Sequence, residues 1–328
     1  MTNYAWPVVD FGAYLDPNSS PEQRKAVAHA VDKACRHLGI FYLVNHGIPQ
    51  ELFDRVRECG RRFFQLSREE KQKHKVASDT RGYVYFEDVE DGVHKDHNEG
   101  IGFYPPVNSY SNGLAPNADP ISPDARLPTV PDALGEQDSW PSDEFRATSE
   151  EYQTHLLRLH NWLLDAIVTG LGISTEAQNW MHKPALSLHF NGYQALNKAD
   201  IEKGGISLVE HADAGFITFL NQDPGPASLQ VKDNDGNWHI VEPIPDALVV
   251  NVGTILSLWT GGQYVATMHR VVHCSSKPRV SLAAFIEPPF DAIVQTLAKF
   301  TTTGKHQTEH PPKPYGAHVL GQIAGYAK

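Results

Sequence analysis

Three residues in the second half of the chain have the types and the spacing of a metal site. His211 and Asp213 are separated by one residue at the head of the apolar run "HADAGFITFL". Residues two apart on an extended strand leave from the same face, so both side chains could reach one ion. His269 follows in a second strand-like stretch, "YVATMHRVVH". Two imidazoles and one carboxylate on one side of an ion form the arrangement that suits non-haem Fe(II) and leaves coordination positions open.

A cation and a hydroxyl follow His269 in the segment "RVSLAAFIEP". On an extended strand Arg279, Ser281 and Phe285 share one face, while the residues between them form an apolar face. A guanidinium with a neighbouring hydroxyl can clamp a carboxylate, and the charge-assisted bond contributes roughly 1.5 to 3 kcal/mol. Taken singly, Arg279 could serve an internal salt bridge and Ser281 could be a neutral strand residue. Because they follow His269 closely in the sequence, we favour the interpretation that they form a carboxylate-binding pair.

Two further stretches resemble metal-binding patterns, but their surroundings argue against them. With 17 His in the chain, a second His-x-Asp pair can arise by chance; this pair, His94 and Asp96, lies among charges and precedes no apolar strand. The stretch "HQTEH", residues 306–310, matches a zinc-hydrolase pattern that requires a helix. The flanking stretches "TTTGK" and "PPKPY" break helices. We therefore favour the site around His211.

The composition is that of an ordinary globular protein with an acidic balance. The 328 residues contain 28 Lys and Arg against 39 Asp and Glu, a formal charge of −11. With no block of basic residues, nucleic acid and anionic membranes are not expected as partners. No apolar run reaches the length of a membrane span, no signal-peptide pattern is present, and three widely spaced Cys suggest no disulfide framework. We expect a cytoplasmic protein that binds a small molecule; the sequence does not indicate its oligomeric state.

The elements that would position these residues change character along the chain. The first part predicts β, α, β, α, with a helix that begins at the capping box of Ser20 and a strand over 40–44. Residues 104–143 predict a long irregular connection, and the apolar spacing predicts a helix over 144–171. Short apolar runs follow, among them "ALSLHF", "ALVVNV", "ILSLW" and "RVSLAAFIEP". Many short strands separated by turn residues favour an antiparallel sandwich or jelly roll.

Taken in order, these motifs resemble the 2-oxoglutarate and Fe(II)-dependent dioxygenases of the isopenicillin N synthase-like family. The stretches "HADAG", "MHRV", "RVS" and "FIEP" match the family's pattern, and "PVVDF", "GIFYLVNHGIP", "LVVNVG" and "WTGG" extend the likeness over nearly the whole chain. The resemblance implies an α+β fold: a double-stranded β-helix (jelly roll) core with an N-terminal α/β region and supporting helices. The expected division is an N-terminal α/β region over 1–120 and a jelly-roll dioxygenase region over 121–328, together one catalytic unit.

The resemblance also implies cofactors and a reaction. It assigns Fe(II) to His211, Asp213 and His269, and the distal carboxylate of the cosubstrate 2-oxoglutarate to Arg279 and Ser281. With O2, such an oxidoreductase oxidises a small organic substrate and releases succinate and CO2. Hydroxylation is the default outcome, with desaturation and ring rearrangement as alternatives. Two other hypotheses stay open at this point: an Fe(II) oxidase of the same fold that does not use 2-oxoglutarate, and a binding protein with an idle or structural metal site.

Some site residues rest on analogy with the family alone. Where relatives often carry N-Y-Y-P, this chain has "HFNGY", so Asn191 and Tyr193 are candidate contacts of the cosubstrate. By analogy, Phe103, Phe216 and Phe285 are expected to line the substrate pocket.

The identity of the substrate is the least constrained expectation. The acidic net charge favours a small, largely uncharged molecule, and the habits of the family suggest a role in secondary metabolism. The residue after "VNVG", frequently Asp in the family, is Thr254 here. Asp96 and Glu99 resemble the family's D-x-x-E, which favours a structural role for them.

Overall fold

The computed structural model describes residues 4–76, 81–85, 98–104, 138–173, 181, 184–202, 204, 208–289, 292–301 and 312–316. The helices are α1 (Gly12–Leu15), α2 (Pro21–His37), α3 (Gln50–Phe64), α4 (Arg68–Gln72), α6 (Asp143–Leu171), α7 (Lys198–Glu202), α8 (Thr254–Trp259) and the 3-10 helix η3 (Ala298–Phe300). The strands are β1 (Val8–Asp10), β2 (Ile40–Val44), β3 (Gly82–Tyr85), β4 (Asn98–Phe103), β5 (Ala185–Tyr193), β6 (Leu208–His211), β7 (Ile217–Gln222), β8 (Leu229–Lys232), β9 (Trp238–Ile240), β10 (Leu248–Val252), β11 (His269–Val271), β12 (Arg279–Glu287), β13 (Ile293–Val294) and β14 (Lys313–Pro314).

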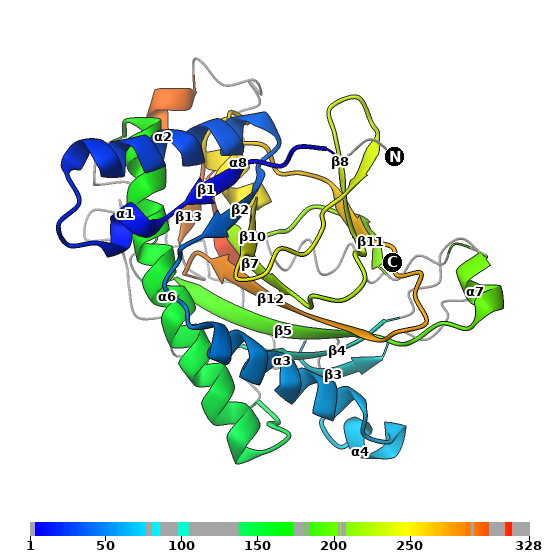
Figure 1. The fold of residues 1–328 in the computed structure, drawn as a ribbon. Coiled ribbons are helices and arrows are strands. Elements are labelled where there is room, and N and C mark those ends of the chain that lie inside the picture. Colours follow the sequence, from blue (N-terminus) through cyan, green and yellow to red (C-terminus); the bar gives the residue numbers. More distant parts are fainter. Residues whose placement is uncertain are drawn as a thin grey trace.

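Two sheets build the core (Figure 1). The larger has eight strands in the order β1-β2-β10-β7-β12-β5-β4-β3, and the smaller has four in the order β6-β11-β8-β9. Apart from the parallel pair β1–β2, the pairs within both sheets are antiparallel. Strands from both ends of the sequence therefore meet in one sheet, since β2 pairs with β10 and β4 pairs with β5.

The two faces of the large sheet have different partners. Phe41, Leu282 and their neighbours at every second position belong to a core shared with α2, α3 and α6, which lie on that side in Figure 1. Alternate residues such as Tyr42 and Val249 belong to a second cluster with Leu229 of the small sheet. Because side chains alternate along a strand, each strand of the large sheet presents one set of residues to the helices and one to the small sheet.

The jelly-roll core and the N-terminal α/β order confirm the expected fold class. At the start of α2, the Ser20 side chain accepts a hydrogen bond from the Gln23 backbone N–H at 3.3 Å, and the Gln23 side chain accepts one from the Ser20 N–H. This capping box satisfies amide groups that the first turn leaves unpaired. The predicted helix over 144–171 is α6, which begins at Asp143 and ends at Leu171.

One predicted strand was wrong. The run "ILSLW" lies in α8, which begins directly after β10. Its buried residues Ile255, Leu256 and Trp259 have the spacing of a helix face, whereas five apolar-rich residues alone do not separate a helix from a strand. The strands β3 and β4 were not predicted.

Several sequence predictions lie outside the described residues. These are the pattern at 94–96, the pattern at 306–310, most of the irregular connection, and the division between residues 120 and 121. Glu99 is described, and its buried carboxylate forms an ion pair of 2.7 Å with Lys71 and accepts a hydrogen bond from the Tyr83 hydroxyl at 2.7 Å. This supports its expected structural role. Within the ranges that the structure covers, none of the helices is long and apolar enough to cross a membrane.

Candidate active site

The two histidines of the predicted metal site lie on neighbouring strands of the small sheet. His211 is the last residue of β6, and His269 is the first residue of β11. The two are paired directly in the antiparallel register, and their ring centroids are 4.3 Å apart. Asp213 lies two residues beyond the end of β6, so its carboxylate reaches the same place.

The side-chain atoms that could bind a metal converge. Oδ1 of Asp213 lies 3.6 Å from Nε2 of His211 and 3.6 Å from Nε2 of His269. The three ligand atoms, one from each residue, all lie within 4.8 Å of one another. Among the described residues, this is the cluster of potential ligand side chains that could hold a metal ion. Two imidazole nitrogens and one carboxylate oxygen are the donor set of a facial Fe(II) site.

Backbone carbonyls fix the orientation of both imidazoles. Nδ1 of His211 lies 2.8 Å from the carbonyl oxygen of Val209, and Nδ1 of His269 lies 3.2 Å from that of Thr267. A carbonyl only accepts, so each Nδ1 carries the proton and donates it. Nε2 of each ring is then left with a lone pair directed at the convergence point, which is the tautomer that a metal ligand requires.

The carboxylate of Asp213 is held from behind. Its Oδ2 accepts hydrogen bonds from the Thr218 hydroxyl at 2.5 Å and from Nδ2 of Asn251 at 2.7 Å, while Oδ1 faces the two histidines. Burial alone would raise the pKa of Asp213, but the charge of His269 and His211, when these are protonated, and the two hydrogen bonds outweigh it and hold the pKa below its ordinary value. The ligand is therefore charged and oriented without a metal.

The turn that carries Asp213 is locked against the start of α8. The backbone N–H of Thr254 donates to the carbonyl of Asp213 at 2.8 Å, and the Thr254 hydroxyl donates to that of Ala214 at 3.1 Å. A Cβ at Gly253 would lie 2.0 Å from the carbonyl oxygen of Gly215, so only glycine permits this approach. Thr254, whose role the sequence did not indicate, thus holds the metal-site turn.

The predicted carboxylate clamp lies on the face of β12 that looks toward the small sheet. Arg279 is 1% exposed and donates hydrogen bonds to the Ser281 hydroxyl at 3.1 Å and to Oε1 of Gln222 at 3.3 Å. Its guanidinium lies 4.9 Å from the ring centroid of Tyr193. Burial lowers the pKa of Arg279, and its Nε has no hydrogen-bond acceptor among the described residues. A buried guanidinium of this kind can strongly stabilise the carboxylate group of a bound ligand.

Of the three predicted substrate-lining aromatics, the structure places one toward the site. Phe285 is partly buried on the same face of β12 as Arg279, and its ring lies 5.2 Å from that of His189. Phe103 belongs to the helix-side core and stacks on Trp140 with ring centroids 3.8 Å apart. Phe103 therefore packs the core and does not line the site, which corrects the expectation from analogy.

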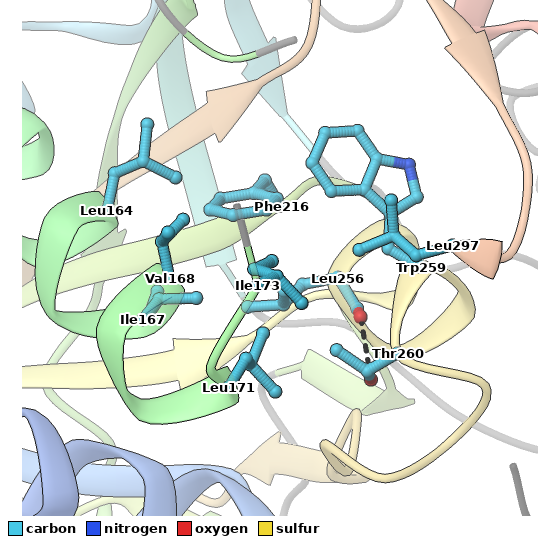
Figure 2. A pocket seen from close by; sticks show the side chains of 10 residues that line it. All are labelled: Leu164, Ile167, Val168, Leu171, Ile173, Phe216, Leu256, Trp259, Thr260 and Leu297. Carbon is cyan, nitrogen blue, oxygen red and sulfur yellow. Dashed lines mark hydrogen bonds between the residues drawn. The ribbon is translucent and has the colours of Figure 1, made fainter. Parts of the chain in front are cut away.

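Phe216 also belongs to the helix-side core. Together with Leu164, Leu256 and Trp259 it borders a cavity of about 10 Å³ between α6 and α8 (Figure 2). The hydroxyl of Thr260 at this cavity donates to the Leu256 carbonyl at 3.0 Å, so the lining is apolar. A cavity near the volume of one water with no free polar partner is a packing gap rather than a binding site. Since Phe216 is buried in this core among residues of α6 and α8, it packs the core, which corrects the expectation from analogy.

Several site residues were not predicted from the sequence. One is His189, which lies on the same face of β5 as the predicted Asn191 and Tyr193, and whose Nε2 is 3.0 Å from the Tyr104 hydroxyl. Burial lowers the pKa of His189 to about 4, so its imidazole is neutral.

Thr218, Asn251 and Gln222 were missed as well. They come from strands that only the sheet register brings together. The available signal was weak: Thr218 and Gln222 are four residues apart and so share one face of β7, and Asn251 is a single polar residue in an apolar strand.

Family models match both parts of the chain. A model of the N-terminal region of non-haem dioxygenases in morphine synthesis matches residues 6–124, and the model of the 2OG-Fe(II) oxygenase superfamily matches residues 190–288. The latter range contains the three convergent ligands and the Arg279 clamp.

Relatives and solved structures agree with these matches. A homoarginine-6-hydroxylase of Glycine max is 30% identical over 97% of this chain and 96% of its own length. The crystal structure of a full-length Neurospora crassa protein in complex with alpha-KG superposes with a TM-score of 0.80 at 22% identity and covers 97% of this chain and 96% of that one. That of JOX2 in complex with 2OG, Fe and JA superposes with a TM-score of 0.75 at 25% identity over 98% of this chain and 85% of the other.

The two open hypotheses from the sequence can now be judged. These relatives support neither an oxidase that does not use 2-oxoglutarate nor a binding protein without activity. The chain therefore belongs to the 2OG-Fe(II) oxygenase superfamily: it is a non-haem dioxygenase that uses Fe(II), 2-oxoglutarate and O2 to oxidise a small organic substrate.

Proposed function

We propose that His211, Asp213 and His269 are the three protein ligands of the iron. The observation that carries this assignment is the convergence of their ligand atoms, with the opposite atom of each side chain already bound by the protein. Because the protein supplies three ligands on one side, the remaining positions stay open for the cosubstrate and O2. A structural metal site is usually closed by protein ligands, so an open site is suited to catalysis.

We further propose that Arg279 and Ser281 bind the distal carboxylate of 2-oxoglutarate. The guanidinium is buried, so it interacts with a carboxylate more strongly than an exposed cation does. Gln222 and the ring of Tyr193 restrict the guanidinium to one orientation. Tyr193 is proposed as a positioning residue for Arg279, and Asn191, on the same face of β5, as a second contact of the cosubstrate.

The bound iron supplies oxidation of an unactivated C–H bond by O2, coupled to decarboxylation of 2-oxoglutarate. The chain contributes orientation of the ligands, a binding site for the cosubstrate carboxylate and exclusion of water. Hydroxylation is the proposed outcome, with a small organic molecule as the substrate. The relative named homoarginine-6-hydroxylase makes hydroxylation of a guanidino amino acid the first reaction to assay.

The division into two regions is proposed on the same grounds. The regions 1–120 and 121–328 act as one catalytic unit, because strands of the first region complete the sheet that carries Arg279. A role in secondary metabolism and a cytoplasmic location stay predictions.

The test is an anaerobic titration of the apoprotein, first with Fe(II) and then with 2-oxoglutarate. We expect the visible charge-transfer band of an Fe(II)–2-oxo acid chelate in the wild type and no iron binding in D213A. In R279A the band should require roughly 10- to 100-fold more 2-oxoglutarate, since the lost charge-assisted bond contributes about 1.5 to 3 kcal/mol.

A matched control for the clamp is R270A. Arg270 lies on β11, where it stacks on Trp238 at 4.0 Å and donates a hydrogen bond to Gln230. The substitution removes an arginine near the site without touching the proposed clamp, so the 2-oxoglutarate requirement should not change. An unchanged requirement in R279A as well would reject Arg279 as the cosubstrate anchor.

A further inference from the structure

One partly buried carboxylate on the site face of β12 has no role in the functions described so far. Glu287 is the last residue of β12, and it lies eight residues beyond Arg279. Residues at even spacing along this strand turn to the same side, and the intervening residues such as Ile286 belong to the helix-side core. Glu287 therefore shares the site face with Arg279, Ser281 and Phe285.

The register of β7 with β12 shows on which side of the metal residues Glu287 lies. Thr218, which holds the carboxylate of Asp213, is paired with Phe285, whereas Gln222, which holds Arg279, is paired with Ser281. The carboxylate that Thr218 holds is thus level with Phe285, and with Arg279 as the proposed clamp the cosubstrate would extend from there toward the Arg279 end of the strand. This leaves the Glu287 end of the same face for the substrate.

The surroundings of Glu287 provide hydrogen bonds but no positive charge. Its carboxylate accepts a hydrogen bond from the Ser187 hydroxyl at 3.5 Å and interacts with the hydroxyl of Tyr315. A Cβ on Gly215, two residues beyond Asp213, would lie 3.4 Å from Cγ of Glu287, so the side chain borders the metal-site turn. In the part of the chain that the structure describes, Glu287 forms no salt bridge with Lys or Arg.

Burying a carboxylate without a cationic partner costs free energy, and a bound cationic ligand would reduce this cost. Burial raises the pKa of Glu287 to about 7, which is the expected response of a carboxyl group that lacks a counter-charge. His189, which is paired with Ala283 farther toward Arg279, has a neutral imidazole and adds no positive charge to this face. The aromatic ring of Phe285 beside it offers an apolar surface on which the carbon chain of a ligand could pack.

We propose that Glu287 binds a cationic side-chain group, an ammonium or a guanidinium, on the substrate of this dioxygenase. The inference rests on the proposed function, because it takes the metal residues and the Arg279 clamp as its reference points. It also revises the expectation of a largely uncharged substrate: net charge describes the whole surface, whereas Glu287 is a local charge inside the site.

The test compares amino acids that have a cationic side chain with amino acids of similar shape that have a neutral side chain. Succinate release by the iron-loaded enzyme is measured with L-homoarginine, L-arginine and L-lysine, and with L-homocitrulline, L-citrulline and L-norleucine as their neutral counterparts. We expect at least one cation to stimulate 2-oxoglutarate turnover and its neutral counterpart to require about 10- to 100-fold higher concentration. The variant E287Q should lose this preference, while E58Q, which alters an exposed carboxylate of α3, should keep it.

Each outcome separates this inference from the proposed function. If the wild type forms no Fe(II)–2-oxoglutarate chelate, the proposed function fails and this inference fails with it. If the chelate forms but no cation stimulates turnover, or a neutral counterpart works as well, only the role of Glu287 is overturned. A cation preference that persists in E287Q, with its melting temperature unchanged, also rejects Glu287 as the binding group.

Discussion

Asp213 uses its two carboxylate oxygens for different tasks. Oδ2 is bound by Thr218 and Asn251 within the large sheet, and Oδ1 faces His211 and His269 of the small sheet. One side chain thereby lies between groups of both sheets at the point where a metal would bind. Such supporting hydrogen bonds commonly contribute about 10- to 100-fold to metal affinity.

The choice between the two His-x-Asp pairs gives a prediction at this scale. The variant H211A should lose iron-dependent turnover entirely, because it removes one of three converging ligands, whereas H94A should keep it. Iron content after anaerobic loading and succinate release measure the two effects, and circular dichroism checks that both variants fold. Inactivation by H94A with full activity in H211A would mean that the wrong pair was chosen.

The residues of the site differ in how far the sequence indicates them. The five residues that could be predicted lie in short local patterns that name the chemistry directly: His211, Asp213, His269, Arg279 and Ser281. Their supporting residues could not, because Thr218, Asn251 and His189 come from three strands whose register is a property of the folded sheet. Analogy failed for Phe103 and Phe216, since being aromatic does not determine the face of the sheet on which a residue lies.

At the scale of elements, the small sheet carries both histidines and the large sheet carries the groups that orient Asp213 and the cosubstrate. Long, strongly periodic elements such as α2 and α6 were predictable, because their apolar spacing repeats over several turns. The short α8 was not, because its apolar run suits a strand equally well. Its helical form matters for function, since its first residue, Thr254, anchors the turn of Asp213.

The contact between this turn and the start of α8 predicts that adding a methyl group at Gly253 weakens iron binding and lowers stability. In G253A the new Cβ would meet the carbonyl oxygen of Gly215 at 2.0 Å and that of Asp213 at 3.3 Å, so the turn has to move. We expect iron affinity to fall by about 10-fold or more, as for lost support of a metal ligand, and the midpoint of thermal unfolding to drop. Equilibrium iron binding and calorimetry measure these effects.

Gly225 provides the matched control for this substitution. A Cβ there would have no atom within 4 Å, so G225A should leave both iron affinity and thermal stability near the wild-type values. Equal iron affinity in G253A and G225A would show that the packing of α8 against the turn does not position Asp213.

At the scale of the whole molecule, packing the helices and sheets together buries ionisable groups, and for several of them the cost of burial outweighs the effect of nearby charges. Burial lowers the pKa of His46, His160 and His189 to about 4 each, from an ordinary value of 6.5. The unfolded chain therefore takes up protons on these three residues as soon as the pH falls below about 6.5, whereas the native protein does so near pH 4. Their contribution to stability is present above pH 6.5 and is lost as the pH falls toward 4.

Glu287 acts in the opposite direction. Its pKa is raised to about 7 from an ordinary value of 4.5, so the native protein holds this proton while the unfolded chain has released it. Its contribution is present below pH 4.5 and is lost as the pH rises through 7. Between pH 4.5 and 6.5 the unfolded chain thus binds up to three extra protons on histidines and the native protein up to one on Glu287.

The apoprotein should accordingly lose stability on acidification across this window. For these four residues alone, a net difference of up to two protons corresponds to a slope of about 3 kcal/mol per pH unit in the free energy of unfolding. Urea unfolding at pH 7, 6 and 5 measures the slope.

In H160Q, which removes a histidine that is fully buried in α6, the slope should decrease by up to about 1.4 kcal/mol per pH unit. H29Q, on the exposed side of α2, should keep the wild-type slope, and a pH-independent stability in the wild type would show that these buried imidazoles are not neutral in the native protein.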